Sequence, residues 1–183
     1  MKERPILFSA PMVRALLDGS KTQTRRVVKH PLLCDLSFIV NCGDGWWGDE
    51  EGEVQARCPY GQPGDRLWVR EAWTTHACFD KVPPRDLTTR SIHYIADGEI
   101  ETGKYRPPMF MPRWASRITL EITAVRIERL QDISETDALA EGIDQDTCAP
   151  IAVYRELWEQ INGHASWDLN PWVWVIEFKK APA

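Results

Sequence analysis

The clearest hydrophobic pattern lies over residues 117–129, where apolar side chains alternate with polar ones. The alternating positions are Ile118, Leu120 and Ile122, followed after a change of phase by Val125 and Ile127. Successive side chains of a strand point to opposite faces of its sheet, so this alternation predicts a strand. A bulge or bend near Thr123 and Ala124 would explain the change of phase, because one extra residue shifts the alternation by one position.

Apolar residues spaced by three or four positions predict helices in other parts of the chain. The predicted helices cover residues 9–19, 134–142 and 150–162. Ser9 and Ser134 stand at the start of the first two, where a hydroxyl can accept a hydrogen bond from the helix N-terminus. Gly19, Gly142 and Gly163 stand where the helices end, as is typical of residues that tolerate a left-handed C-cap.

Further strands are predicted over residues 21–28, 66–71 and 172–178. The last of these is apolar on nearly both faces, which indicates a central position in a small barrel or mixed sheet. Stretches at about 30–63 and 74–112 are rich in glycine and proline and show weak periodicity, so they predict two irregular insertions. The expected fold class is therefore α+β.

Length and composition are those of an ordinary globular protein. A chain of 183 residues favours one domain over residues 1–183 rather than two. Hydrophobic residues at 43% and charged residues at 27% exclude a wholly disordered or collagen-like chain. The formal net charge of −5 disfavours non-specific wrapping of long nucleic acid, because such binding neutralises many phosphates. A locally basic cleft stays open as an alternative.

The chain carries no pattern typical of membrane insertion or export. No apolar run approaches the roughly 18 residues that a membrane helix needs, and the N-terminus lacks a cleavable signal pattern. We therefore expect a cytoplasmic protein without a membrane partner. The five cysteines are an odd number without close pairing, which fits reduced thiols better than a disulfide framework.

Motifs for a metal or a dinucleotide are weak. No C-x-x-C pair occurs, and His76-Ala77-Cys78 is a single poor ligand pair, so we expect no metal and no cofactor. The stretch 43–48 matches G-x-G-x-x-G, but acidic residues follow where a helix N-terminus should attract a pyrophosphate. We interpret this stretch as a glycine-rich surface loop.

A cationic motif follows the first predicted helix and reads Gly19-Ser20-Lys21-Thr22-Gln23-Thr24-Arg25-Arg26. It resembles the G-x-K-x-x-E-x-R motif of the ASCH superfamily, whose β-barrel fold is related to the PUA domains that handle RNA. Thr24 stands where many members have glutamate. The resulting K-x-x-T-x-R pattern is similar to that of small bacterial amidohydrolases that remove acetyl from N4-acetylcytidine. Residues 64–69 and 175–179 resemble strands of the same family.

The resemblance implies a PUA-like (ASCH) β-barrel with flanking helices, to which the two insertions are added. It also implies an amidohydrolase in which Thr24 is the nucleophile, Lys21 the base, and Glu141 the acid and base. Arg26 would orient the substrate or stabilise the oxyanion. The expected partner is a small-molecule nucleoside or RNA, and the oligomeric state is left open. The longer form of the chain resembles ASCH-domain proteins encoded by bacteriophages and prophages.

This chemistry sets two physical conditions. A threonine hydroxyl is a weak nucleophile, so Lys21 can activate it only if its pKa falls well below about 10.4. Crowding by Arg25 and Arg26, and partial burial, would both lower that pKa. Lys21 and Thr24 would also point to opposite faces of an ideal strand, so the chain must turn between them for the two side chains to meet.

Four residues outside the motif are candidates for the substrate pocket. Nine tryptophans occur, and most belong to periodic apolar segments that predict a core. Trp73 and Trp114 lie in irregular chain beside Glu71 and Arg113, and we expect these four to line the pocket. Glu71 could accept from a cytosine amino group, with an ion pair to a nearby arginine as the alternative.

Three alternatives accompany the hydrolase hypothesis. The cations near Lys21 could form only a solvated rim that complements a helix dipole, and Glu141 could be an exposed helix end. The same basic cleft could bind RNA or a modified nucleotide, with or without ribonuclease activity. The insertions could instead serve a phage structural protein or a protein that contacts the host.

Overall fold

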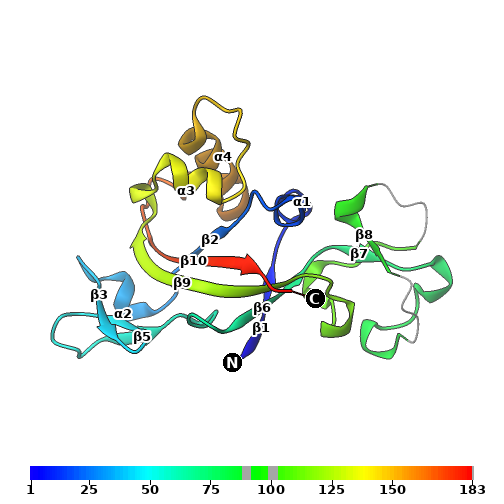
Figure 1. The fold of residues 1–183 in the computed structure, drawn as a ribbon, viewed down its shortest axis with the longest axis horizontal. Helices are drawn as coiled ribbons and strands as arrows, with labels where there is room; N and C mark the ends of the chain where they lie inside the picture. The colour runs from blue at the N-terminus through cyan, green and yellow to red at the C-terminus, as the bar shows by residue number, and fades with distance from the viewer. Residues whose placement is uncertain (88–91, 99–102, 183) are drawn as a thin grey trace.

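The computed structural model describes residues 1–87, 92–98 and 103–182, and is built on one strongly curved sheet (Figure 1). Its strands, in spatial order, are β1 (Glu3–Leu7), β6 (Arg66–Arg70), β9 (Thr119–Arg129), β10 (Trp172–Lys180) and β2 (Gln23–Val27). β1 and β6 are parallel, and the other neighbours are antiparallel. The elements confirm a mixed α+β architecture.

The closed barrel expected from the resemblance is not confirmed. Among the described residues β1 and β2 end the sheet on opposite sides and do not pair with each other. The edge of β2 meets a helix instead, because the backbone N–H of Thr22 donates to the carbonyl of Ala140 at 2.9 Å. Covering an edge strand in this way satisfies part of its backbone without closing the sheet.

The long helices agree with the predicted segments. They are α1 (Ala10–Asp18), α3 (Glu135–Ala140) and α4 (Pro150–Asn162), and a single turn, α2 (Pro31–Cys34), follows β2. Ser134 caps α3 by accepting a hydrogen bond from the backbone of Asp137 at 3.1 Å, as predicted. Ser9 occupies the N-cap of α1 without such a bond, and Gly19 ends that helix with φ at +87°. α3 and α4 lie together on one side of the sheet (Figure 1).

The bulge predicted in β9 is confirmed at the expected place. Ala124 pairs with Glu177, and the next residue of β10, Phe178, pairs with Ile122. Thr123 is therefore the extra residue on β9. The insertion bends the longest strand and resets which of its side chains face each side of the sheet.

β10 is buried on both faces, as its sequence predicted. Val173 and Val175 join the core beneath α3 and α4, with Tyr154 and Trp158 of α4. The alternate residues of β10 join the main core on the opposite face of the sheet. These residues are Trp174, Ile176 and Phe178. The central strand thus supports both hydrophobic layers, since neighbouring strands flank it on each side.

The first insertion is more ordered than predicted. It contains a separate sheet of β3 (Val40–Gly43), β4 (Trp46–Gly48) and β5 (Gln55–Arg57). The glycine-rich stretch forms the hairpin turn between β3 and β4, in which Gly43 and Gly45 have φ of +85° and +76°. The prediction of irregular chain was wrong here because most side chains of this sheet are exposed, so no hydrophobic alternation marks the strands.

The second insertion pairs β7 (Trp73–Thr74) with β8 (His93–Tyr94) and has its own small core. Short 3₁₀ turns make up much of the rest: η1 (Ala77–Phe79), η2 (Pro84–Asp86), η3 (Ile95–Asp97), η4 (Pro108–Phe110) and η5 (Arg113–Ala115), while η6 (Leu130–Asp132) follows β9. Parts of this predicted insertion, 88–91 and 99–102, lie outside the described residues.

Within the described chain, none of the helices is both long and apolar enough to cross a membrane.

Candidate functional site

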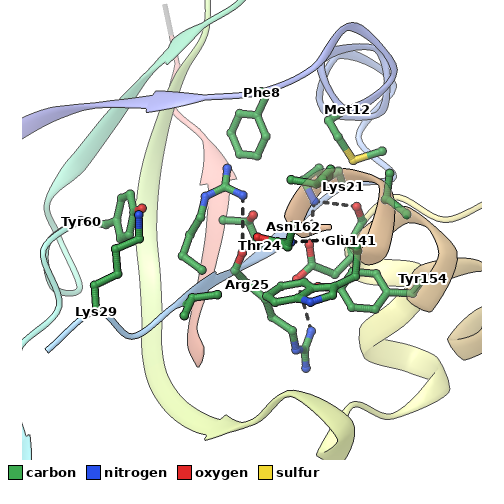
Figure 2. Close-up of a pocket in the computed structure, with 15 residues that line it drawn as sticks. Phe8, Met12, Lys21, Thr24, Arg25, Lys29, Tyr60, Glu141, Tyr154 and Asn162 are labelled. Atoms are coloured by element: carbon green, nitrogen blue, oxygen red, sulfur yellow. Dashed lines mark hydrogen bonds and ion pairs between the residues drawn. The ribbon is translucent and has the colours of Figure 1, made fainter. Parts of the chain in front are cut away.

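The three residues predicted to act together come from three separate places in the fold and line one cavity of about 210 Å³ (Figure 2). Lys21 lies between α1 and β2, Thr24 lies in β2, and Glu141 is the C-cap residue of α3. The cavity is bounded on another side by the last turns of α4, which contribute Asn162. The fold therefore gathers a lysine, a hydroxyl and a carboxylate around one space.

The route of the chain before β2 explains how Lys21 and Thr24 reach the same cavity. β2 begins only at Gln23, so the alternation of a strand does not extend back to Lys21. The backbone N–H of Lys21 donates to the carbonyl of Ala15 at 2.9 Å, which folds this segment back onto α1. This reversal lies before Lys21 and not between Lys21 and Thr24 as predicted, and the two side chains reach one cavity with Lys21 placed ahead of the strand.

Gly142 allows the end of α3 to approach Lys21 closely. Its φ is +90°, a left-handed conformation that side chains rarely adopt. A Cβ on this residue would lie 3.0 Å from the Cβ of Ala15 and 3.1 Å from that of Lys21. The glycine that the sequence indicates as a helix stop is thus also needed for the contact that brings Glu141 to the site.

Lys21 and Glu141 form a buried ion pair, with 4% and 3% of each residue exposed. The Lys21 Nζ donates to Oε2 of Glu141 at 2.9 Å and to the Glu141 carbonyl at 2.6 Å. Burial lowers the pKa of Lys21 because the ammonium loses its hydration, and this effect outweighs the opposing attraction of Glu141. The direction of the shift is the one that a lysine base requires.

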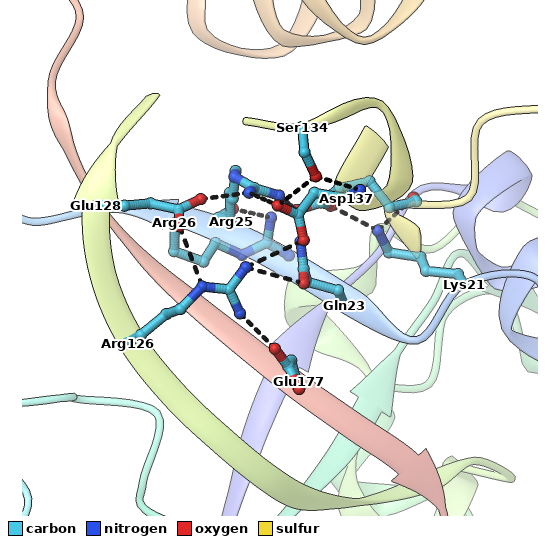
Figure 3. A network of polar contacts seen from close by, with 10 residues as sticks. Lys21, Gln23, Arg25, Arg26, Arg126, Glu128, Ser134, Asp137 and Glu177 are labelled. Carbon is cyan, nitrogen blue, oxygen red and sulfur yellow. Dashed lines mark hydrogen bonds and ion pairs between the residues drawn. The ribbon is translucent and has the colours of Figure 1, made fainter. Parts of the chain in front are cut away.

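Arg25 holds the other oxygen of the Glu141 carboxylate. Its side chain is fully buried, and its Nη1 donates to Oε1 of Glu141 at 3.3 Å. Its Nη2 lies 3.3 Å from Oδ2 of Asp137 and also donates to Glu128 (Figure 3). Glu141 is therefore fixed between two cations, Lys21 on one oxygen and Arg25 on the other.

A second arginine extends this network away from the cavity. Arg126 donates to Glu128 and to Asp137, each at 3.0 Å, and also pairs with Glu177 of β10 (Figure 3). Sequence reasoning named none of these four residues as part of the site. The signal was present in β9, because Arg126 and Glu128 are two positions apart and so share one face of a strand.

Thr24 and Arg26 complete the polar part of the cavity. In the described chain the Thr24 hydroxyl makes no hydrogen bond, so it shares the cavity with Lys21 and Glu141 without bonding to either. Arg26 donates to the carbonyl of Leu7 at 2.8 Å, with its guanidinium carbon 5.2 Å from the centre of the Phe8 ring. Lys29, a fourth cation near the motif, also lines the cavity, together with four residues that the sequence did not single out as site residues: Phe8, Tyr60, Tyr154 and Asn162.

Two predicted pocket residues, Glu71 and Trp73, do not line this cavity. Glu71 is buried and accepts two hydrogen bonds from Arg117, each at 3.0 Å, which is the ion pair kept as the alternative. Burial raises the pKa of Glu71, although Arg117 opposes the shift. Trp73 is fully buried in the core of the second insertion.

Arg113 and Trp114 also lie away from the cavity. Arg113 pairs with Glu3 at 3.0 Å, between η5 and the first strand. Trp114 is partly exposed on the same turn. The irregular sequence context was interpreted as a pocket lining, but neither residue lines the cavity that holds Lys21 and Thr24.

Within the described ranges, no three His, Cys, Asp or Glu side chains come together as a metal site.

No family model matches the sequence, and no curated protein matches it either. A solved ASCH-domain structure from Lactobacillus crispatus aligns with 98% of this chain and 79% of that one, at 12% identity and a TM-score of 0.48. The chain is similar to an ASCH domain. A DUF984 protein from Enterococcus faecalis aligns with 99% of this chain and 81% of that one, at 11% identity and a TM-score of 0.45.

Proposed function

We propose that the chain hydrolyses the exocyclic amide of N4-acetylcytidine or a related acylated cytosine nucleoside. The observation that carries the proposal is the buried pair of Lys21 and Glu141, 2.9 Å apart, in the wall of a cavity that Thr24 also lines. A buried lysine with a lowered pKa, in one cavity with a hydroxyl and a carboxylate, supplies a base, a nucleophile and a proton donor for acyl transfer through a covalent ester.

In the first half of the reaction, neutral Lys21 takes the proton of Thr24 while the threonine oxygen attacks the acyl carbon. The carbon–nitrogen bond then breaks, and the pair of Lys21 and Glu141 returns a proton to the leaving N4 amine. Cytidine departs, and an acyl ester remains on Thr24. In the second half, Glu141 takes a proton from water, whose oxygen attacks the ester. The bond between the acyl carbon and the Thr24 oxygen breaks, Glu141 gives its proton to that oxygen, and the acid is released.

The cations of the cavity have different parts in this scheme. Arg26 lines the cavity and carries a guanidinium able to stabilise the oxyanion that forms on the acyl oxygen. Arg25 does not need to touch the substrate. It is a positioning residue, because its bond to Glu141 fixes the carboxylate that Lys21 also holds.

The test is to incubate the pure protein with N4-acetylcytidine and follow its conversion to cytidine by ultraviolet absorbance. We expect hydrolysis by the wild type, loss of hydrolysis in Thr24→Val, and retention of a measurable rate in Thr24→Ser, which keeps the hydroxyl. Acyl-ester formation on Thr24 can be followed by mass spectrometry. A fully active Thr24→Val variant would disprove the role of this hydroxyl.

A second candidate function is binding of RNA or a modified nucleotide in the same cavity without chemistry. Arg26, Lys29 and Tyr60 in the cavity wall favour it, since cations and an aromatic face are the groups that hold a nucleotide. If the wild type is inert toward N4-acetylcytidine but retains labelled RNA in a salt-sensitive manner, this candidate replaces the first.

The lowered pKa of Lys21 predicts the pH dependence of the reaction. The base is the neutral amine, so kcat/KM should rise with pH and level off once Lys21 is deprotonated. The midpoint should fall below 10.5, the ordinary pKa of the side chain. The measurement is a pH profile corrected for spontaneous hydrolysis, with Thr24→Ser expected to keep the same midpoint. A midpoint at or above 10.5 would contradict a buried lysine base.

A further inference from the structure

A second and larger cavity adjoins the candidate site. Its volume is about 500 Å³, and it runs between β1, the start of α1 and the second insertion. The two cavities have part of their walls in common. The shared residues are Phe8, Met12, Arg26, Tyr60 and Ile161. The two cavities therefore adjoin at these five side chains, with Phe8 and Met12 between the polar groups near Lys21 and the second cavity.

The second cavity is apolar, in contrast to the first. Its lining outside the shared residues consists of Pro5, Ile6, Leu7, Ser9, Ala10, Ala72, Ile95, Tyr105 and Pro108. Among the described lining residues Arg26 alone is charged, and its guanidinium already bonds the carbonyl of Leu7. A phosphate or a ribose placed there would lose water without gaining enough polar partners, whereas an apolar group would gain from burial.

Residues 5–12 contribute seven of the fourteen lining residues of this cavity, and the two insertions contribute four. Tyr60 comes from the end of the first insertion, and Ile95, Tyr105 and Pro108 come from the second. The volume of about 500 Å³ lies in the range of cavities that hold small molecules, about 300–1,000 Å³. It far exceeds what the methyl of an acetyl group would occupy.

We infer that this cavity holds the acyl substituent of the substrate, and that the chain prefers a bulky apolar acyl group, such as benzoyl, to acetyl. The inference rests on the proposed function for the orientation of the substrate, with the acyl carbon at Thr24 and the substituent beyond Phe8. The preference for the acyl group is then set by β1, the start of α1 and the insertions together, while the polar groups around Lys21 contact the amide.

The experiment measures dissociation constants of N4-benzoylcytidine and N4-acetylcytidine by calorimetry, on the full chain carrying Thr24→Val so that neither compound is consumed. We expect the benzoyl compound to bind about tenfold more tightly or better, the scale that apolar pocket contacts reach. Tyr105→Ala and Leu7→Asn should each reduce this ratio severalfold. Both residues are well exposed, at 59% and 46%, so these changes spare the core.

Phe110→Ala is the matched control. Phe110 is an aromatic residue of the same insertion with 57% exposure, and it does not line the cavity, so its loss should leave the ratio unchanged. Equal affinities for the two compounds, no binding of either, or a ratio insensitive to both cavity variants would overturn the inference. A benzoyl preference in binding without hydrolysis by the wild type would retain the subsite and reject the hydrolase.

Discussion

Replacing Lys21 with methionine is expected to lower kcat/KM for N4-acetylcytidine by about 10²–10⁴-fold, the usual contribution of a general base. Methionine approximates the length of the lysine stem but cannot accept the proton of Thr24. The rate is measured by the absorbance assay at a pH where the wild type has reached its plateau. Circular dichroism on the same samples establishes that the variant is folded.

Lys21→Arg separates catalysis from structure at this position. Arginine retains a cation for Glu141, so most of the free energy of unfolding should be kept, whereas its guanidinium stays protonated and cannot serve as a base. We therefore expect a stable but inactive protein. An active Lys21→Arg variant would mean that the lysine acts only as the ionic partner of Glu141.

Replacing Arg25 with methionine is expected to lower the free energy of unfolding by about 3–5 kcal/mol, the scale for removing one partner of a buried ion pair. The side chain is fully buried and serves three carboxylates, those of Glu128, Asp137 and Glu141. Without the Arg25 guanidinium, these three carboxylates repel one another more strongly because less positive charge lies between them. Urea unfolding followed by tryptophan fluorescence gives the change directly.

Arg155→Met is the matched control for Arg25→Met. Arg155 pairs with Glu159 and Asp168, but its side chain is 48% exposed, so its removal should change the free energy of unfolding by less than about 1 kcal/mol. A loss of similar size in both variants would show that burial of the Arg25 network adds no stability.

Acidification tests whether the loss in Arg25→Met is electrostatic. Burial opposes ionisation of Asp137, but the hydrogen bond from Ser134 and the charges of Arg25 and Arg126 outweigh it and lower its pKa below 3.8. A carboxyl with a lowered folded pKa stabilises the fold above its unfolded pKa, and this contribution disappears as pH falls through the folded value. The difference in the free energy of unfolding between the wild type and Arg25→Met should therefore become smaller below pH 3.8. If this difference does not change with pH, the stability lost in Arg25→Met comes from packing and not from electrostatics.

Local features of this chain were determined by its sequence. The helix over Pro150–Asn162 and the capped helix that begins after Ser134 follow from apolar spacing and end signals. The bulge at Thr123 follows from a change in alternation. Each of these depends on neighbours a few residues apart, so the pattern along the chain contains the information.

The site was only partly contained in the sequence. Lys21, Thr24 and Glu141 were named through a family resemblance, whereas Glu71 and Trp73 were named from their irregular sequence context, and the fold buries these two away from the cavity. Side-chain type and local irregularity cannot distinguish a residue that lines a cavity from one packed in a separate core. That distinction depends on how distant segments pack around each side chain in the folded protein.

Tertiary structure alone decided the remaining features. The pairing of β2 with β10, the docking of Ala140 on Thr22, and the burial of Arg25 among carboxylates join segments more than a hundred residues apart. The same long-range packing leaves the sheet open and places the insertions around an apolar cavity. Such contacts form because the apolar side chains on both faces of β10 have to be buried, each face by other segments of the chain. No local pattern specifies which distant segment will cover them.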